Sequence, residues 1–276
     1  MTRDVANNPV CVWGLALSPL SLAATIETVG QLVEKRQSAY FITANTHYAM
    51  LTREHPELHD VNARAAFLVA DGAPLVWASR RGPRALPERV AGSDLIYSLS
   101  ELAARQGYRV FFAGGAPGVA LTAAERLQAR YPALQVAGTA SPHFRDLSAA
   151  EYDQLKRQIA EARTDILIVA ATMPLGEQWL FANLDDLGVP VGVNLGAALD
   201  FAAGRVNRAP RWMQKTGLEW AFRLLLEPRR LFPRYARNAW FIVNMALRGK
   251  GRPSSRGAVP SSTPSATILT SQKATQ

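Results

Sequence analysis

Short apolar runs alternate with longer amphipathic segments along most of this chain. The runs have the length of buried strands and lie at residues 10–17, 40–42, 66–70, 109–113, 134–137, 165–170 and 189–195. Apolar residues recur at helical spacing between them, at residues 20–36, 48–54, 75–81, 93–105, 119–130 and 149–163. Strands that are repeatedly separated by helices must pair in parallel through right-handed crossovers. The order predicts a Rossmann-like, mostly parallel α/β sheet with helices on both faces.

A carboxylate, Asp71, directly follows the apolar run at residues 66–70 and precedes Gly72. Taken alone, an Asp-Gly pair is more typical of a tight turn or a helix cap than of catalysis. In open α/β sheets, however, ligands bind outside the carboxyl ends of the strands. Asp71 is therefore a candidate for chemistry if Arg89 and Asp94 face the same crevice. Other polar residues that follow predicted strands, and would by default be helix caps, include Thr43 and Asn45.

A glycine-rich turn at residues 114–118 separates the predicted strand at 109–113 from the helix at 119–130. Backbone N–H groups in such a turn can face a phosphate, helped by the helix dipole. The turn is not G-x-G-x-x-G and lacks the acidic residue that follows it in dinucleotide-binding folds. A nucleotide-binding α/β enzyme of another kind is therefore an alternative that ranks second.

The chain of 276 residues is long enough for one large domain with additions. Its single cysteine, Cys11, excludes an internal disulfide, and its four histidines lack zinc-site spacing. We find no apolar signal sequence and no run of the roughly 20 apolar residues that a bilayer span requires. These features predict a cytoplasmic protein that is not integral to a membrane, and they leave a homo-oligomer open.

Positive charge is concentrated in one segment. Residues 1–204 hold 17 basic and 20 acidic residues, a net charge of −3, whereas residues 205–256 hold 13 basic and two acidic residues, a net charge of +11. Trp and Leu alternate with these arginines, which favours an anionic membrane surface as the partner. A basic nucleic-acid-binding protein is the alternative. We expect an α/β catalytic domain over 1–204, a helical membrane-associating appendage over 205–248 and a disordered tail over 249–276.

Several motifs in this chain resemble those of the WecG/TagA/CpsF glycosyltransferases, also called glycosyltransferase family 26. They are T-x-N at 43–45, D-G at 71–72, E-R-V-x-G-S-D at 88–94, G-G-x-P-G-V-A at 114–120, D-F-x-A-G at 200–204 and a long arginine-rich motif at 208–235. The resemblance spans about residues 10–240. It implies an inverting hexosyltransferase that moves a sugar from a UDP-sugar to a saccharide on undecaprenyl diphosphate, in cell-surface polysaccharide synthesis at the inner face of the membrane. The sugar would be of the N-acetylmannosamine type, its uronic acid, or glucose.

The resemblance also implies roles for individual residues. Asp71 would be the general base that takes the proton from the acceptor hydroxyl, and Arg89 would face the departing diphosphate without a metal. The sequence has no D-x-D motif or histidine cluster, so no metal or other cofactor is expected. The residues implied in substrate binding are Thr43, Asn45, Gly72, Asp94, Gly114, Gly115, Glu177, Gly196, Asp200, Arg208, Arg211, Arg223, Arg229 and Arg234.

Two stretches depart from the family pattern. The pattern P-K-Q-E-x-W reads Pro-Leu-Gly-Glu-Gln-Trp at residues 174–179, so Gly176 stands in place of a glutamine, and Gln178 would point elsewhere on a helix. The pattern G-V-G-G-A-F-D reads Asn-Leu-Gly-Ala-Ala-Leu-Asp at residues 194–200, so Asn194 and Ala197 stand in place of glycines. Both stretches border the expected donor site, and the departures predict an altered sugar pocket with the same reaction.

Overall fold

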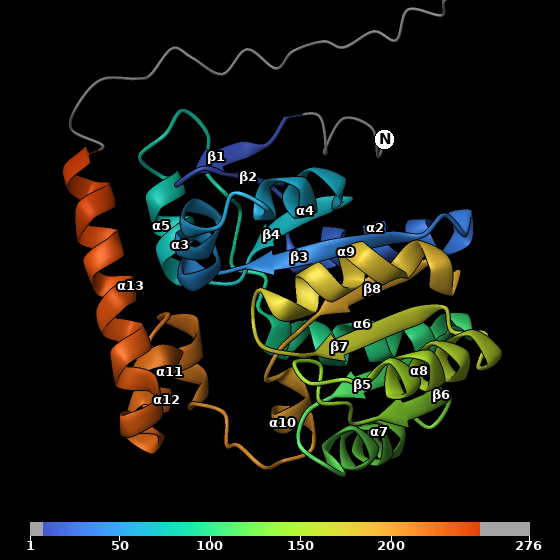
Figure 1. Ribbon diagram of the computed structural model, residues 1–276. Helices are drawn as coiled ribbons and strands as arrows, with labels where there is room; N and C mark the ends of the chain where they lie inside the picture. Colours follow the sequence, from blue (N-terminus) through green and yellow to red (C-terminus); the bar gives the residue numbers. More distant parts are fainter. Residues whose placement is uncertain (1–7, 249–276) are drawn as a thin grey trace, which may run out of the picture.

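Six parallel strands form the centre of the protein (Figure 1). The computed structural model describes residues 8–248, apart from the side chains at 211, 215, 230 and 248. The strands run in the spatial order β4-β3-β8-β7-β5-β6, and every pairing between them is parallel. Their bounds are β3 (Ala39–Ala44), β4 (Phe67–Ala70), β5 (Arg109–Gly114), β6 (Gln135–Ala140), β7 (Ile166–Ala170) and β8 (Val191–Asn194). The predicted parallel α/β sheet is confirmed.

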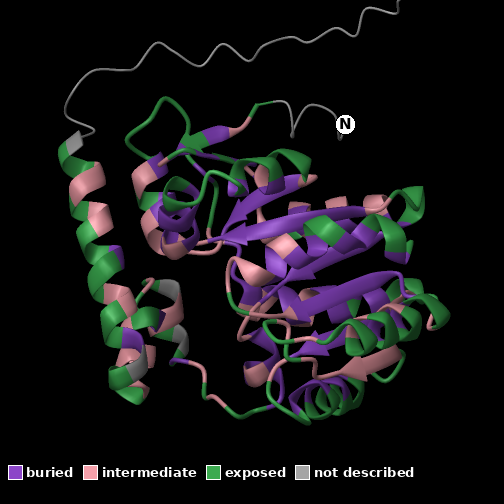
Figure 2. Cartoon of the chain, in the orientation of Figure 1, coloured by how far each residue is buried: buried purple, intermediate pink, exposed green. Residues whose placement is uncertain are grey.

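Helices cover both faces of this sheet, as predicted, and divide the apolar interior into two cores. One core includes α2 (Leu22–Lys35), α6 (Gly92–Gln106), α7 (Val119–Arg130) and α10 (Ala198–Ala202). The other includes α3 (Thr46–Glu54), α4 (Leu58–Arg64), α5 (Ala73–Ser79), α8 (Ala149–Glu161) and α9 (Leu175–Leu187). Alternate residues of β3 serve the two sides, with Phe41 in the first core and Tyr40 and Ile42 in the second. Figure 2 shows the strands buried between helices whose outer faces are exposed.

The path of the chain through the sheet changes direction beside β3 and β8. From β3 it moves outward to β4 at one edge, then crosses to β5 and on to β6 at the other edge, and returns through β7 to β8. Open α/β sheets bind ligands outside the carboxyl ends of their strands at such a switch point. The crevice beyond β3, β4, β7 and β8 is therefore where the topology favours a site.

The N-terminal part differs from the prediction. Instead of one strand at residues 10–17, two short antiparallel strands, β1 (Val10–Val12) and β2 (Leu15–Leu17), form a hairpin outside the main sheet. The reason is the turn, where Trp13 and Gly14 both take positive φ, at 50° and 93°. The α4 helix was also not predicted, since its sequence, LHDVNAR, is mostly polar.

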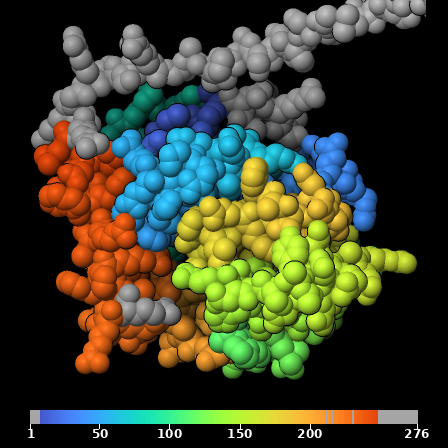
Figure 3. Space-filling model, in the orientation of Figure 1, coloured from blue at the N-terminus to red at the C-terminus, as the bar shows by residue number. Residues whose placement is uncertain are grey.

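Three helices follow the sheet domain: α11 (Arg211–Lys215), α12 (Glu219–Leu226) and α13 (Pro228–Arg248). We call residues 205–248 the appendage; in Figure 3 it lies, in orange and red, along one side of the sheet domain. Arg237 of α13 makes two hydrogen bonds to the carboxylate of Glu54 at the end of α3. Phe241 packs edge-to-face on Trp13, with ring centroids 5.5 Å apart. The α13 helix is thus held against α3 and the hairpin.

Within residues 8–248, no helix combines the length and apolar character needed to cross a membrane. The expected disordered tail at 249–276 lies outside the described residues.

Candidate active site

Asp71 lies one residue beyond β4, half-buried at the carboxyl edge of the sheet. Its backbone N–H donates to the carbonyl of Ala44, 2.7 Å away, which extends the β3–β4 pairing. Its carboxylate accepts a hydrogen bond from the backbone N–H of Gly92 at the start of α6. Asp71 does not cap the following helix, because Gly72 is the N-cap residue of α5 and no side chain caps it. The carboxylate is therefore directed toward α6.

The surroundings of Asp71 make it unusually basic for an aspartate. Burial raises the pKa of its carboxyl group to about 7, against the opposing effects of Arg89 and the Gly92 hydrogen bond. Glu219 and Asp94 raise this pKa further, because a second negative charge nearby disfavours ionisation. A carboxylate whose pKa is close to the working pH suits proton abstraction better than one that is already strongly acidic.

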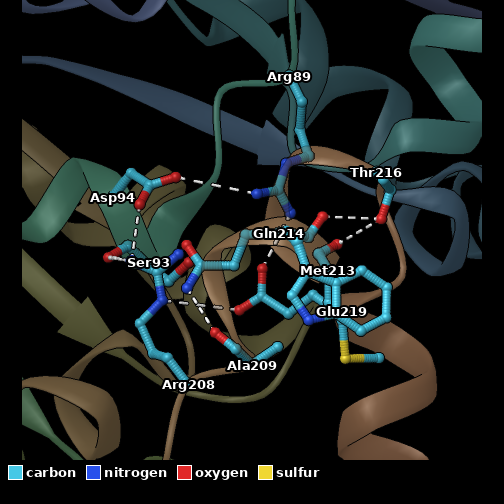
Figure 4. A network of polar contacts seen from close by, with 10 residues as sticks. Arg89, Ser93, Asp94, Arg208, Ala209, Met213, Gln214, Thr216 and Glu219 are labelled. Atoms are coloured by element: carbon cyan, nitrogen blue, oxygen red, sulfur yellow. Dashed lines mark hydrogen bonds and ion pairs between the residues drawn. The ribbon is translucent and has the colours of Figure 1, made fainter.

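Figure 4 shows a network of four charged side chains, and three of them, Arg89, Asp94 and Glu219, are close enough to Asp71 to shift its pKa. Nη1 of Arg208 lies 2.7 Å from Oδ1 of Asp94, and Nη1 of Arg89 lies 3.1 Å from Oε2 of Glu219. Longer contacts of 3.9 Å for Arg89 with Asp94 and 3.7 Å for Arg208 with Glu219 complete the network. Arg89 precedes α6 and Glu219 opens α12, so the network connects the appendage to the sheet domain.

This network brings the guanidinium group of Arg89 close to a potential base, and the guanidinium group of Arg208 binds the same two carboxylates. Guanidinium groups bind phosphate oxygens through parallel, charge-assisted hydrogen bonds. Within the protein, the counterions of Arg89 and Arg208 are Asp94 and the buried Glu219. The arrangement can therefore stabilise a phosphate group next to a carboxylate that takes up a proton.

A second group of predicted residues meets around Asn194, the last residue of β8. The side-chain oxygen of Asn194 accepts hydrogen bonds from the backbone N–H groups of Ala171, at 3.1 Å, and Gly196, at 3.3 Å. Its side-chain nitrogen donates to Oε1 of Glu177 at 3.0 Å, and the hydroxyl of Thr43 donates to its carbonyl at 3.3 Å. Burial raises the pKa of Glu177 to about 7, against the hydrogen bond from Asn194.

Asn45 borders both groups. Its side-chain oxygen caps α3 by accepting from the backbone N–H of Tyr48 at 3.0 Å, which confirms the default expectation for this residue. Its side-chain nitrogen lies 3.4 Å from Sδ of Met173, in the turn between β7 and α9. On its other side, a Cβ on Gly72 would lie 3.8 Å from Asn45. Asn45 thus links the ends of β3, β4 and β7.

Two predicted glycines are explained by backbone geometry. Gly114 has a φ of 118°, and a Cβ there would lie 2.4 Å from the carbonyl oxygen of Ala170 on the neighbouring β7. Gly115 has a φ of 75° and packs under Val119 of α7. These contacts explain the two glycines whether or not a ligand binds nearby. That the turn faces a nucleotide stays a prediction.

The remaining predicted residues lie farther along the appendage and at α10. Asp200 is in the first turn of α10, where its carbonyl accepts from the N–H of Arg205. Arg223 of α12 lies over the ring of Phe201, 5.3 Å from its centroid. On α13, Arg229 is exposed and Arg234 lies near His47 of α3. The side chain of Arg211 is outside the described part of the structure.

Two residues that connect the site were not predicted from the sequence. The sequence marks Asn194 only as a residue in place of a glycine, and Glu219 only as one of two acidic residues in a basic segment. An acidic residue in an otherwise basic segment, here Glu219, indicates an ion pair with a particular arginine, because a carboxylate that is buried needs a cationic partner.

Comparison with known proteins adds independent information. The model of the Glycosyl transferase WecG/TagA/CpsF family matches residues 10–256. A protein of Bacillus spizizenii is 30% identical over 210 residues, covering 76% of this chain and 79% of its own length. One of Bacillus subtilis is 28% identical, covering 74% and 80%, and one of Staphylococcus aureus is 26% identical, covering 72% and 76%. All three are named N-acetylglucosaminyldiphosphoundecaprenol N-acetyl-beta-D-mannosaminyltransferase.

Proposed function

The chain belongs to the WecG/TagA/CpsF family and is a glycosyltransferase of polysaccharide biosynthesis; from this premise we propose its substrates and the roles of its residues. The donor is a UDP-sugar, with N-acetylmannosamine as the first choice because the three relatives are named for that sugar. The acceptor is N-acetylglucosamine on undecaprenyl diphosphate, as in those names. The uronic acid and glucose remain further donors to test, since the pocket departs from the family pattern.

The observation that carries this proposal is the position of Asp71 beside Arg89, which shares its carboxylate partners Asp94 and Glu219 with Arg208. As the acceptor hydroxyl attacks the anomeric carbon, Asp71 takes its proton, and the bond from that carbon to the UDP oxygen breaks. One displacement inverts the anomeric centre. Such a base contributes roughly 10²- to 10⁴-fold to the rate. Arg89 and Arg208 stabilise the negative charge that develops on the diphosphate.

The surface of the appendage supports a location at the membrane that carries the acceptor. Large apolar side chains are exposed there, and Leu225 and Trp240 are 79% and 68% accessible. The others are Trp212, Leu218, Trp220, Leu226, Phe232, Val243 and Leu247. Exposed aromatic and leucine side chains among basic residues are typical of helices that lie in an anionic membrane interface. We propose that the appendage holds the protein at the cytoplasmic face of the membrane.

A donor panel tests the function directly. The purified full-length protein is incubated with UDP-N-acetylmannosamine, its uronic acid and UDP-glucose, together with a short-chain polyprenyl diphosphate that carries N-acetylglucosamine. We expect one of these donors to extend the acceptor by a single sugar, with the β configuration at the new linkage if the donor is α-linked. Absence of extension with every donor, or retention of configuration, would contradict the proposal.

The pKa of Asp71 predicts the pH dependence of the reaction. Because the base must be ionised and its pKa is about 7, kcat/KM should rise about tenfold per pH unit below pH 7 and level off above it. The measurement is kcat/KM for the donor between pH 5.5 and 9. Glu177→Gln serves as a control for the second buried carboxyl group, and it should keep the same rising limb. A limb that disappears in Glu177→Gln would assign the titration to Glu177 instead.

We also predict that transfer needs no divalent metal. Arg89 and Arg208 can neutralise the leaving diphosphate, and the sequence offers no D-x-D motif. Turnover should be unchanged in excess EDTA and unaffected by added Mg²⁺ or Mn²⁺. Loss of turnover in EDTA that Mn²⁺ restores would show that the arginines are insufficient.

A further inference from the structure

Gly176, in the first turn of α9, shares its space with the side chain of Asn194. A Cβ on residue 176 would lie 2.4 Å from both Cγ and Nδ2 of Asn194 and 2.7 Å from its Oδ1. Hydrogen bonds hold that amide in place, so it cannot simply rotate away. Any larger residue at 176 therefore requires a different residue at 194.

The amide of Asn194 joins three segments at the carboxyl edge of the sheet. It binds the turn after β7 through Ala171, the turn after β8 through Gly196 and the first turn of α9 through Glu177. Asn194 is 1% exposed, so water does not compete for these hydrogen bonds. One side chain thus fixes the relative position of three segments at the carboxyl edge of the sheet.

The group that Asn194 holds in place on α9 is the buried carboxyl group of Glu177. One carboxyl oxygen accepts from Asn194 and the group also interacts with its own backbone N–H, while Oε2 is buried without a hydrogen-bond partner from any other described residue. An unsatisfied buried oxygen costs free energy, and in native proteins it often marks a functional position. Asn194 is the side chain that sets the orientation of this carboxyl group.

The two departures from the family pattern are related by this contact. The family pattern that this chain resembles has an amide at position 176 and a glycine at 194; this chain has a glycine at 176 and an amide at 194. Since the two side chains compete for one volume, the departures form a single exchange that moves the amide from α9 to β8.

We propose that Asn194 is a positioning residue of the donor site and that its amide occupies the volume that a side chain at position 176 would otherwise fill. It holds Glu177 and the turns after β7 and β8 in the arrangement that the donor sugar meets. The nature of the donor rests on the proposed function, whereas the exchange between positions 176 and 194 does not.

A double-mutant cycle tests the exchange. The proteins compared are wild type, Asn194→Gly, Gly176→Gln and the double variant, and the measurements are Tm and the donor KM and kcat. Each single change should raise KM about tenfold and lower Tm, one by removing the amide and the other by overcrowding it. The double variant should recover most of both losses. Additive losses in the double variant would overturn the exchange.

Two further variants separate positioning from general stability. Asn194→Asp keeps an acceptor for Ala171 and Gly196 but replaces the donor to Glu177 with a second buried carboxyl group, so it should raise KM and make Tm fall more steeply with rising pH than in wild type. An unchanged KM would overturn the positioning role. Gly192→Ala is the matched control on the same strand, where a Cβ would meet Leu180 at 2.8 Å. It should lower Tm without raising KM. If wild type uses no UDP-sugar, the proposed function fails, and the Tm cycle alone still decides the exchange.

Discussion

Asp71→Asn should reduce transfer by at least about 10²-fold while leaving the fold intact, because the amide keeps the shape of the carboxyl group and loses its basicity. The Asn oxygen can still accept the hydrogen bond from Gly92. Steady-state turnover of the donor and acceptor, with UDP binding measured by calorimetry, separates the two effects. UDP affinity should change little, since the charges of Arg89 and Arg208 remain.

Thermal unfolding provides the control for this variant. The folded-state pKa of Asp71 is about 7 and its ordinary value is 3.8, so the folded protein favours the neutral form. The stability that this preference supplies is complete below pH 3.8 and is lost as pH rises through 7. Asn stays neutral, so Asp71→Asn should unfold at the same or a higher temperature than wild type at pH 8. Near-normal turnover in a folded variant would remove Asp71 from the mechanism.

Removal of the appendage should have the second-largest effect, because it deletes Arg208 and Glu219 from the network beside Asp71. A chain that ends at residue 204 should no longer bind anionic liposomes. Its turnover on a soluble, short-chain acceptor should also fall about 10²-fold. Each basic residue near an anionic leaflet contributes about 1 kcal/mol, so the full-length protein should bind firmly and reversibly with salt.

Point variants of the full chain distinguish anchoring from catalysis. Arg208→Gln should reduce turnover on the soluble acceptor while liposome binding remains. Trp240→Ser combined with Leu247→Ser, on the exposed surface of α13, should do the reverse. A truncated protein that is fully active on the soluble acceptor would make the appendage only an anchor. The proposed site would then no longer include Arg208, Arg211, Arg223, Arg229 and Arg234.

The sheet could be predicted from the sequence because its signals are local. The run DILIVA at residues 165–170 has no polar side chain after its first residue, and its short length and its Ile and Val content favour a strand buried on both faces. The hairpin at residues 10–17 was wrongly read as one strand, because its turn depends on positive φ at Trp13 as well as at Gly14. Tryptophan gives no sequence signal for such a turn.

The site was only partly predictable for a different reason. The position of Asp71 followed from the strand that precedes it, but its partners come from distant parts of the chain. Arg89 and Glu219 are separated by 130 positions, and Asn194 and Glu177 by 17. No periodicity connects such pairs. Membership of the glycosyltransferase family favours an enzyme over a nucleic-acid-binding protein, which charge alone had left as an alternative.

In the role proposed for Arg89, the carboxylate of Glu219 makes diphosphate binding an exchange of anions. A diphosphate that approaches Arg89 competes with a counterion that is already 3.1 Å away, so only the difference between the two attractions contributes to affinity. A nucleotide product is consequently held less tightly than by a bare guanidinium group, which favours its release. Glu219 belongs to α12, so the same competition links nucleotide affinity to the position of the appendage. A surface that holds α12 in one position then changes the affinity for the nucleotide by some factor. By thermodynamic reciprocity, the bound nucleotide changes the affinity for that surface by the same factor.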